Sequence, residues 1–404
     1  MRAYLDHAAT SPMPPPVLEA YTEALHLLGN PASTHAHGQL ASEQLEAARE
    51  RIARRLGADP ALVTLTGGGT ESINLAIKGF YWAAVRRANA RNSNEAPVLL
   101  IATGEHHATI EAAEWLRDFQ GAELRLLPLD SDGVLQPETL RAAIAEIGAS
   151  RIALVSFLWA NNEVGSLQPV RELAATAREA GVLTHVDAVA ALGQVAIDFG
   201  AAGVDALSVS AHKIGGPVGV GALLIARGAT PEALVHGGSQ QRARSGTQNV
   251  AGAVAFAAAL DHAYGASDDE FAAKLGRLRE VRERLIAGVQ QAVPDAVLRG
   301  SRAAGTESAD PRLAGNAHFT FPGCQGDSLV FLLDAAGVSA SVGSACQAGV
   351  AEISHVLLAM GVPEHEAIGS LRFTLSPTTT EAEVDALVEA LPNAVARART
   401  AGLA

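Results

Sequence analysis

The sequence predicts an α/β protein with a mostly parallel, seven-stranded sheet in a large domain and a smaller α+β domain after it. The prediction rests on short apolar segments that alternate with segments of helical apolar spacing, and on Gly-rich turns that follow several apolar segments. The length of 404 residues exceeds one ordinary hydrophobic core and favours two domains. We expect residues 14–262 to form the large domain, and residues 1–13 and 263–404 to form the small one.

The first elements after an extended start are two helices. Three prolines at 14–16 favour the first turn of a helix at 17–28, because the proline ring fixes the backbone angle that this turn needs. A polar loop at 29–38 separates it from a helix at 40–56, whose apolar residues recur on one face.

The large domain then alternates strands with helices. Apolar segments bounded by turn residues predict strands at 62–66, 98–103, 122–127, 151–159, 182–187, 206–210 and 220–226. Helical spacing predicts helices at 71–89, 109–119, 137–147 and 169–180. Sheets of this kind bind ligands at the carboxyl ends of their strands, where the loops gather.

The pattern changes after Thr247. An Ala-rich helix is expected up to about residue 264, and a polar joint at 267–270 begins a long helix that ends at 293. The remainder predicts strands at 318–321, 338–341 and 371–375, with helices at 327–336, 353–360 and 380–401. Such a mixture is typical of an α+β domain.

Composition and charge limit the function. A hydrophobic content of 48% with 18% charged residues is typical of a soluble globular enzyme, and a net charge of −13 without a basic run argues against a nucleic-acid partner. The N-terminus lacks an apolar signal segment, and the longest apolar stretch, 250–260, is too short to span a membrane. The two cysteines, Cys324 and Cys346, lack metal-ligand spacing. We therefore expect a cytoplasmic protein with reduced thiols and no structural metal.

Lys213 follows the apolar strand 206–210 and stands in a turn rich in Gly and Pro. At such a position a lysine can be held in an apolar pocket, where desolvation lowers its pKa and leaves a neutral amine able to form a Schiff base. A surface lysine that merely follows a strand is the alternative.

Three further polar groups follow predicted strands. The turn 66–71 has the glycines and the helix start that suit a bound phosphate, although tight turns need glycine for other reasons. Asp187 could keep a pyridine nitrogen protonated, or could cap the next segment. His106 could stack on an aromatic cofactor and relay protons near neutral pH, or could be an ordinary loop histidine.

Cys346 stands between small residues at 339–349, which favours an accessible, reactive thiol, whereas Cys324 follows an apolar strand and is interpreted as structural. Arg372 is a cation within an apolar strand and needs an anionic partner. A substrate carboxylate would serve, and an internal salt bridge is the alternative.

Taken together, these segments resemble the cysteine desulfurases of the NifS/IscS type, which are pyridoxal 5'-phosphate (PLP) enzymes of the class V aminotransferase group with the fold type I, aspartate aminotransferase-like architecture. The resemblance covers nearly the whole chain and rests on segments in the expected order: 4–10, 29–31, 68–71, 105–107, 161–163, 185–188, 211–213, 244–247, 343–346 and 371–373.

The resemblance implies roles for individual residues. Lys213 would carry the internal aldimine and move a proton, Asp187 would pair with the pyridinium nitrogen, and His106 would stack on the ring. The other cofactor contacts would come from Gly69, Thr70, Asn162, Ser210, His212 and, from the second subunit of a homodimer, Thr247. Asn162, Arg372 and His35 would bind the substrate. Cys346 would take the substrate sulfur as a persulfide.

The sequence departs from the family at Ala190, where a glutamine usually donates to the cofactor hydroxyl, and Gln194 lies too far along the chain to replace it obviously. We expect an active enzyme with a modestly raised aldimine pKa. Gln347 also follows Cys346 where a hydroxyl residue is commoner.

The implied activity is the conversion of L-cysteine to L-alanine with a persulfide on Cys346, supplying sulfur for iron–sulfur clusters or tRNA thiolation. The implied acceptor is an iron–sulfur scaffold protein or another sulfur acceptor, with at most a transient cluster contact through Cys346. The alternatives are a related PLP enzyme, either a selenocysteine lyase or an aminotransferase, and a catalytically inactive homologue that serves as a scaffold.

Overall fold

The computed structural model describes residues 2–92, 95–301, 311–343 and 353–402. Its largest sheet contains β2 (Val63–Thr66), β3 (Val98–Ala102), β4 (Glu123–Leu127), β5 (Ile152–Leu158), β6 (Thr184–Asp187), β7 (Ala206–Ser210) and β8 (Gly221–Ile225). The strand order is β2-β8-β7-β6-β5-β3-β4. Only β8 runs antiparallel to its neighbours, so the predicted mostly parallel, seven-stranded sheet is confirmed.

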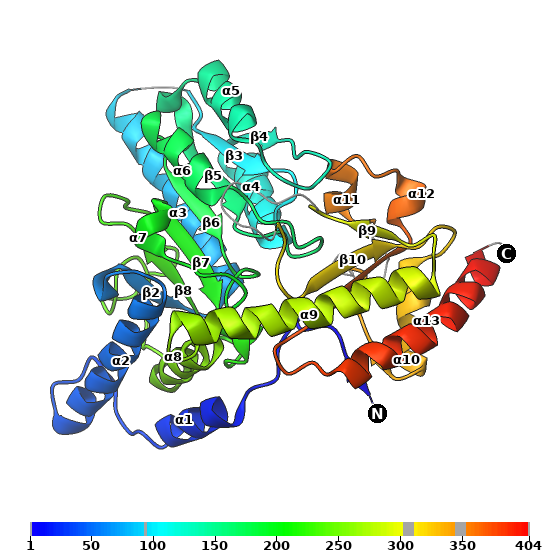
Figure 1. Cartoon of the computed structure of the whole chain (residues 1–404). Coiled ribbons are helices and arrows are strands. Elements are labelled where there is room, and N and C mark those ends of the chain that lie inside the picture. The colour runs from blue at the N-terminus through cyan, green and yellow to red at the C-terminus, as the bar shows by residue number, and fades with distance from the viewer. Residues whose placement is uncertain (1, 93–94, 302–310, 344–352, 403–404) are drawn as a thin grey trace.

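Helices cover both faces of this sheet (Figure 1). They include α2 (Ala36–Arg55), α3 (Gly69–Ala90), α4 (His107–Gln120), α5 (Pro137–Ile147), α6 (Val170–Glu179) and α8 (Val250–Tyr264). Alternate residues of β3 pack to opposite sides: Leu100 joins the core that contains α5 and α6, whereas Leu99 and Ile101 join the core that contains α3 and α4. Burial on both faces explains why β3 is continuously apolar in the sequence.

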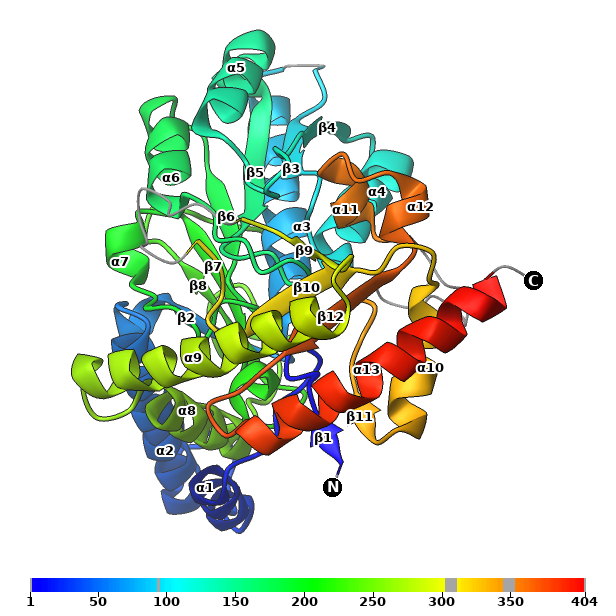
Figure 2. The same cartoon turned by 45° about the vertical axis from the view of Figure 1, so that its right-hand side comes forward.

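A second sheet has the antiparallel order β12-β10-β9, formed by β9 (Val297–Arg299), β10 (Asn316–Thr320) and β12 (Ser370–Thr374). The N-terminal strand β1 (Ala3–Tyr4) pairs with β11 (Val338–Ser339), so the first residues of the chain lie beside the C-terminal part (Figure 2). The remaining helices of this part are α10 (Gly326–Ala335), α11 (His355–Ala359), α12 (Glu364–Ala367) and α13 (Glu381–Gly402).

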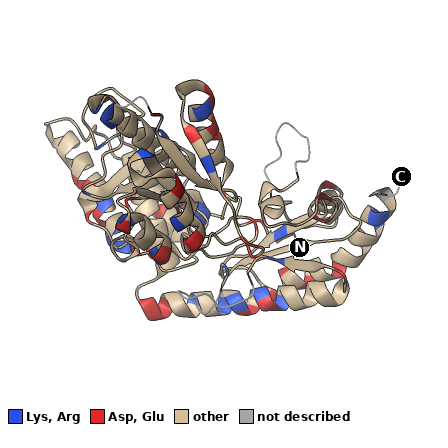
Figure 3. Ribbon diagram, turned by 90° about the horizontal axis from the view of Figure 1, so that it is seen from above, with Lys and Arg blue, Asp and Glu red and all other residues tan. Residues whose placement is uncertain are grey.

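The long helix α9 (Asp268–Ala292) extends along one side of both sheets and packs on α8 and α13 (Figures 1 and 3). Ser267 caps it, and three acidic residues in its first turn complement the helix dipole. Figure 3 shows Lys and Arg interspersed with Asp and Glu along the rest of the helix. Its opposite face buries Phe271, Leu278 and Leu285, which join the larger core.

The structure contains short elements that the sequence patterns did not predict, namely β9, α12 and α7 (Phe199–Ala202). Each has three or four residues, which is too short to establish a period. The helix expected at 17–28 is α1 (Pro15–Leu25) and begins two residues earlier, because Pro15 and Pro16 occupy its first positions. None of the helices in the described ranges has the length and apolar character needed to cross a membrane.

Candidate active site

A cavity of about 440 Å³ lies at the carboxyl ends of β6 and β7 and is closed on its other side by β12. The carboxyl ends of parallel strands are where ligands bind in such sheets. Most of the predicted site residues line this cavity: Gly69, Thr70, His106, Asn162, Asp187, Ser210, His212, Lys213 and Arg372.

Two predicted residues, His35 and Thr247, do not line it. His35 is exposed and caps α2, where its Nδ1 accepts from the Gly38 N–H at 3.2 Å. Thr247 lines a separate small hollow beside Gly67. Cys346 lies outside the described residues. Cys324 is buried, as expected for a structural cysteine.

Lys213 stands in a short 3₁₀ turn (Ala211–Ile214) directly after β7. Its Nζ donates to the backbone oxygens of Ala8 at 2.5 Å and Ala9 at 3.3 Å, which come from the N-terminal segment. Burial and, secondarily, the positive charge of Arg372 lower the pKa of Lys213 to about 8. About a tenth of the amine is therefore neutral at pH 7, far more than for a solvated lysine, which agrees with the prediction from the sequence.

Asp187 is buried at the end of β6, and its Oδ1 accepts from the Val189 N–H at 2.9 Å. Burial raises the pKa of Asp187 to about 6, and no ion pair with it is formed within the described part of the chain. A buried carboxyl without a cation partner suits a ligand that brings a protonated nitrogen.

His185 lies two residues before Asp187 on β6, so the two side chains point to the same face of the sheet. Its ring is hydrogen-bonded to Ser156 Oγ at 2.9 Å and to Ser208 Oγ at 2.8 Å, and burial lowers its pKa to about 3. The neutral, fully partnered ring fixes three adjacent strands below the cavity.

His106 caps α4, because its Nδ1 accepts from the Ala108 N–H at 3.1 Å. The neutral ring therefore carries its proton on Nε2. Burial, followed by the positive charge of Lys213, lowers the pKa of His106 to about 4. The expectation of a group that titrates near neutral pH is thus not met by the chain alone, because a cationic lysine stands close to this desolvated ring.

The Gly-rich turn between β2 and α3 presents the start of α3 to the cavity. Gly68 has φ +140°, which favours glycine, and an ideal Cβ on Gly69 would lie 2.8 Å from Val189 Cγ2. Gly69 and Thr70 form part of the cavity wall. Backbone N–H groups at a helix start attract anions, so this turn can hold a phosphate.

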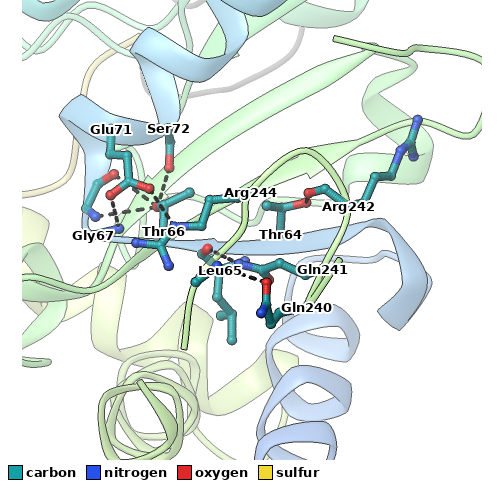
Figure 4. A network of polar contacts seen from close by, with 12 residues as sticks. Thr64, Leu65, Thr66, Gly67, Glu71, Ser72, Gln240, Gln241, Arg242 and Arg244 are labelled. Atoms are coloured by element: carbon teal, nitrogen blue, oxygen red, sulfur yellow. Dashed lines mark hydrogen bonds and ion pairs between the residues drawn. The ribbon is translucent and has the colours of Figure 1, made fainter. Parts of the chain in front are cut away.

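The segment 240–244 lies against this turn and along the edge strand β2 (Figure 4). The Gln241 side chain pairs with the backbone of Leu65 in both directions: Nε2 donates to the Leu65 oxygen at 2.6 Å, and Oε1 accepts from the Leu65 N–H at 3.0 Å. An amide side chain thus satisfies backbone groups that another strand would otherwise pair.

An ion pair connects the same segment to α3. Arg244 Nε donates to Glu71 Oε1 at 3.0 Å, while Glu71 Oε2 accepts from the Gly67 N–H at 2.8 Å (Figure 4). The chain that leads to Thr247 is therefore fixed to the Gly-rich turn.

Arg372 points from β12 toward the cavity from the side opposite Lys213. Its Nη1 donates to the Asn162 backbone oxygen at 2.8 Å, and its Nη2 forms an ion pair with Asp6 at 3.2 Å. Arg372 therefore has an internal salt bridge, with Asp6, and also lines the cavity. Its guanidinium remains within reach of a ligand carboxylate.

The cavity wall also contains residues to which the sequence patterns assigned no site: Ala8, Asn316 and His355. The His355 ring contacts the backbone oxygen of Glu105 at 2.9 Å, and its centroid lies 4.9 Å from that of His107. No local motif marks these positions, since only the tertiary structure brings the first residues, β10 and α11 to the cavity. Gln194 also lines the cavity, with Oε1 accepting from the Gly315 N–H at 2.9 Å, so it is closer to the site than its place in the sequence suggests.

The class-V aminotransferase family model matches residues 3–387. An IscS-like cysteine desulfurase of Mycobacterium tuberculosis is 49% identical over 100% of this chain and 98% of that protein, and the cysteine desulfurase IscS of Dictyoglomus turgidum is 38% identical over 98% and 95%. Among solved structures, a NifS-like protein superposes with a TM-score of 0.85 at 31% identity, covering 98% of this chain and 100% of that one. The chain therefore belongs to the class-V aminotransferase family, within the group of IscS- and NifS-type cysteine desulfurases.

Proposed function

We propose that this chain removes sulfur from L-cysteine with PLP as cofactor, leaving L-alanine and a persulfide on Cys346. The observation that supports this most directly is the meeting of the Lys213 amine, the Asp187 carboxyl and the Arg372 guanidinium in one cavity. The sulfur would go to iron–sulfur cluster assembly or to tRNA thiolation, through a scaffold protein or another acceptor.

The cavity residues fit PLP. The α3 start at Gly69 and Thr70, with Ser210 and His212, offers donors for a phosphate, and the uncompensated Asp187 carboxyl offers a partner for a ring N–H. The Asn162 Oδ1 atom is buried without a hydrogen-bond partner among the described residues, which suits a contact with bound cofactor or substrate. When bound, PLP supplies an aldehyde for the lysine amine and a ring that withdraws electrons from the substrate.

The residues of the chain would then bind the substrate and move its protons. Arg372 and Asn162 would hold the carboxylate, with His35 as a further candidate, and His106 would lie against the cofactor ring. Lys213, with its pKa near neutrality, would transfer the α-proton. The sulfur of Cys346 would bond to the substrate sulfur as the carbon–sulfur bond of the substrate breaks, and a proton would complete alanine.

We also propose a cytoplasmic homodimer with domains at 14–262 and at 1–13 with 263–404. Thr247 lies away from the cavity of its own chain and beside the Gly-rich turn, which agrees with a role in the partner's site. A reduced compartment suits a mechanism that needs a free thiol.

The test is to incubate the purified, PLP-loaded protein with L-cysteine and a reductant, and to assay sulfide and alanine. We expect equal amounts of both products, no product from Lys213→Ala, and loss of sulfide release with Cys346→Ala. An aminotransferase would not need the thiol, so full turnover by Cys346→Ala would favour that alternative. A protein that binds no PLP would contradict the proposal outright.

A further inference from the structure

The N-terminal segment is fixed along the end of β12. The Leu5 backbone oxygen accepts from the Thr374 N–H at 2.8 Å, and the His7 N–H donates to the Thr374 oxygen at 3.3 Å. Asp6 lies between these two bonds. Thr374 is two residues after Arg372 on β12, so Asp6 is held beside the part of the strand that carries this arginine.

The Asp6 carboxylate forms an ion pair with Arg372. Asp6 Oδ1 accepts from Arg372 Nη2 at 3.2 Å, and Nη1 of the same guanidinium donates to the Asn162 backbone oxygen at 2.8 Å. The side chains of Arg372 and Asp6 are only 7% and 21% exposed, so water and salt screen the pair weakly. Within the described ranges, Asp6 is the one acidic residue that is ion-paired with Arg372. The guanidinium is thus held at both Nη atoms.

The held guanidinium can still bind a ligand. Each Nη carries two N–H groups, and the contacts with Asp6 and Asn162 need only one on each. Arg372 lines the cavity, whereas Asp6 does not. A ligand carboxylate would therefore meet Arg372 in addition to Asp6, and the two carboxylates would share one positive charge. This sharing weakens the binding of the second carboxylate, because like charges repel across a partly desolvated site.

We propose that Asp6 tunes the binding of the substrate carboxylate: it orients Arg372, and its negative charge limits how tightly Arg372 holds a carboxylate in the cavity. This rests on the proposed function, because it takes Arg372 as the group that binds the substrate carboxylate. L-alanine, the product, keeps the carboxylate of L-cysteine, so a guanidinium without an internal partner would retain it. Asp6 acts through Arg372 and is a positioning residue.

The charge of Asp6 also reaches Lys213. Burial and the charge of Arg372 lower the pKa of Lys213, and the charges of Asp187 and Asp6 oppose this effect. A change at Asp6 therefore alters the reaction of every amine with the cofactor. The test must compare two amines that differ only in the carboxylate.

The test titrates the cofactor absorbance of the PLP-loaded protein with L-alanine and with ethylamine, which lacks the carboxylate. The measured quantity is the ratio of the two dissociation constants, in which effects on Lys213 cancel. Asp6→Asn keeps an oxygen that accepts from Arg372 Nη2 but removes the negative charge. We expect this variant to bind L-alanine about fivefold more tightly, relative to ethylamine, than the wild-type protein does. Asp6→Ser also removes the charge and should shift the ratio in the same direction if the Asn variant is insoluble.

Asp334→Asn is the matched control. The Asp334 carboxylate pairs with Arg2 Nη2 at 3.1 Å, at the surface and away from the cavity wall. This variant changes the net charge as Asp6→Asn does, and should leave the ratio as in the wild-type protein. An equal shift in the control would show that net charge alone is responsible, and would overturn the proposal.

An unchanged ratio in the Asp6 variant would also overturn the proposal. So would weaker binding of L-alanine relative to ethylamine, because Asp6 would then only orient Arg372. Sulfide release from L-cysteine judges the proposed function separately: a wild-type protein that releases no sulfide but shows the expected ratios would refute the desulfurase activity and support the role of Asp6. A wild-type protein whose absorbance responds to neither amine would contradict both.

Discussion

Burial shifts the pKa values of Lys213 and Asp187 in opposite directions. Burial disfavours the charged form of each group, so the pKa of the amine falls to about 8 and that of the carboxyl rises to about 6. Both groups are therefore close to changing charge at physiological pH, where a ligand can decide their state. This behaviour leads to two predictions.

The rate at which cofactor-free protein binds PLP should follow the deprotonation of Lys213. With a pKa of about 8, the neutral fraction rises roughly fivefold between pH 7 and pH 8 and levels off above about pH 9. Stopped-flow absorbance measures the rate, and the reaction of PLP with N-acetyl-lysine corrects for the titration of PLP itself. A tenfold rise per pH unit that continues to pH 10 would show that Lys213 is an ordinary, solvated lysine.

Asp187→Asn should stabilise the cofactor-free protein at pH 7 while weakening cofactor binding. A carboxyl whose pKa is raised in the folded state binds its proton more tightly there, so stability falls as the pH rises from about 4 to about 6, by roughly 3 kcal/mol at most. The amide carries no charge and avoids this loss. Urea unfolding at pH 7 and pH 4 measures the effect. The gain should be present at pH 7 and absent at pH 4, and a gain of equal size at both would rule out this origin.

At the scale of elements, the Gly-rich turn, the start of α3 and the loop after β6 form one packed unit. Gly69 leaves no room for a side chain against Val189, and Gly68 takes a backbone angle that other residues rarely adopt. The position of the proposed phosphate donors therefore depends on close backbone packing between two loops. A small added side chain should disturb it.

Gly69→Ala should weaken PLP affinity about tenfold, because a Cβ 2.8 Å from Val189 Cγ2 must shift either the start of α3 or the loop after β6. Fluorescence titration of the cofactor-free protein with PLP measures it. Gly276→Ala in α9, where a Cβ would meet nothing within 4 Å, is the matched control. We expect the control to keep wild-type affinity and to gain about 0.5–1 kcal/mol of stability. Equal affinities for the two variants would contradict the role of Gly69.

At the scale of the whole molecule, the site is assembled from both ends of the chain. The N-terminal segment pairs with β11 and carries the backbone oxygens that hold Lys213 and the carboxylate that holds Arg372. The large sheet thus supplies the amine and the small sheet supplies the guanidinium. The relative position of the two sheets therefore determines the distance between the Lys213 amine and the Arg372 guanidinium.

The proposed homodimer gives a prediction at this scale. Leu18, Leu25 and Leu28, in and just after α1, are 53%, 61% and 74% exposed. Leu18 and Leu25 are seven residues apart in α1 and therefore lie on one face of it, and exposed leucines favour an interface. The double variant Leu25→Glu with Leu28→Glu should sediment as a monomer and lose activity on dilution. Phe331→Glu, a substitution at a residue that is 73% exposed on α10, is the control and should leave the mass unchanged. A wild-type protein that sediments as a monomer would contradict the dimer.

Local sequence patterns were sufficient for the long elements and for most of the candidate site. Apart from the edge strand β4, the strands of the large sheet are buried on both faces and therefore mostly apolar. Asp187 ends one of these strands, and Lys213 and His106 follow two others within a few residues. The positions of all three were predictable from sequence, and so was the effect of burial on Lys213, whereas the lowered pKa of His106 also depends on the nearby lysine.

The tertiary structure decided what depends on contacts between distant segments. It brought Asn316 and His355 to the cavity, gave Lys213 its backbone partners near the N-terminus, and placed His318 opposite Arg372 in the register of β10 and β12. It also separated Thr247 from the cavity of its own chain. Hydrophobic periodicity records which side of an element is buried, but it carries no information about which distant element covers that side. Cross-strand register and the placement of short strands such as β9 therefore had to come from the fold.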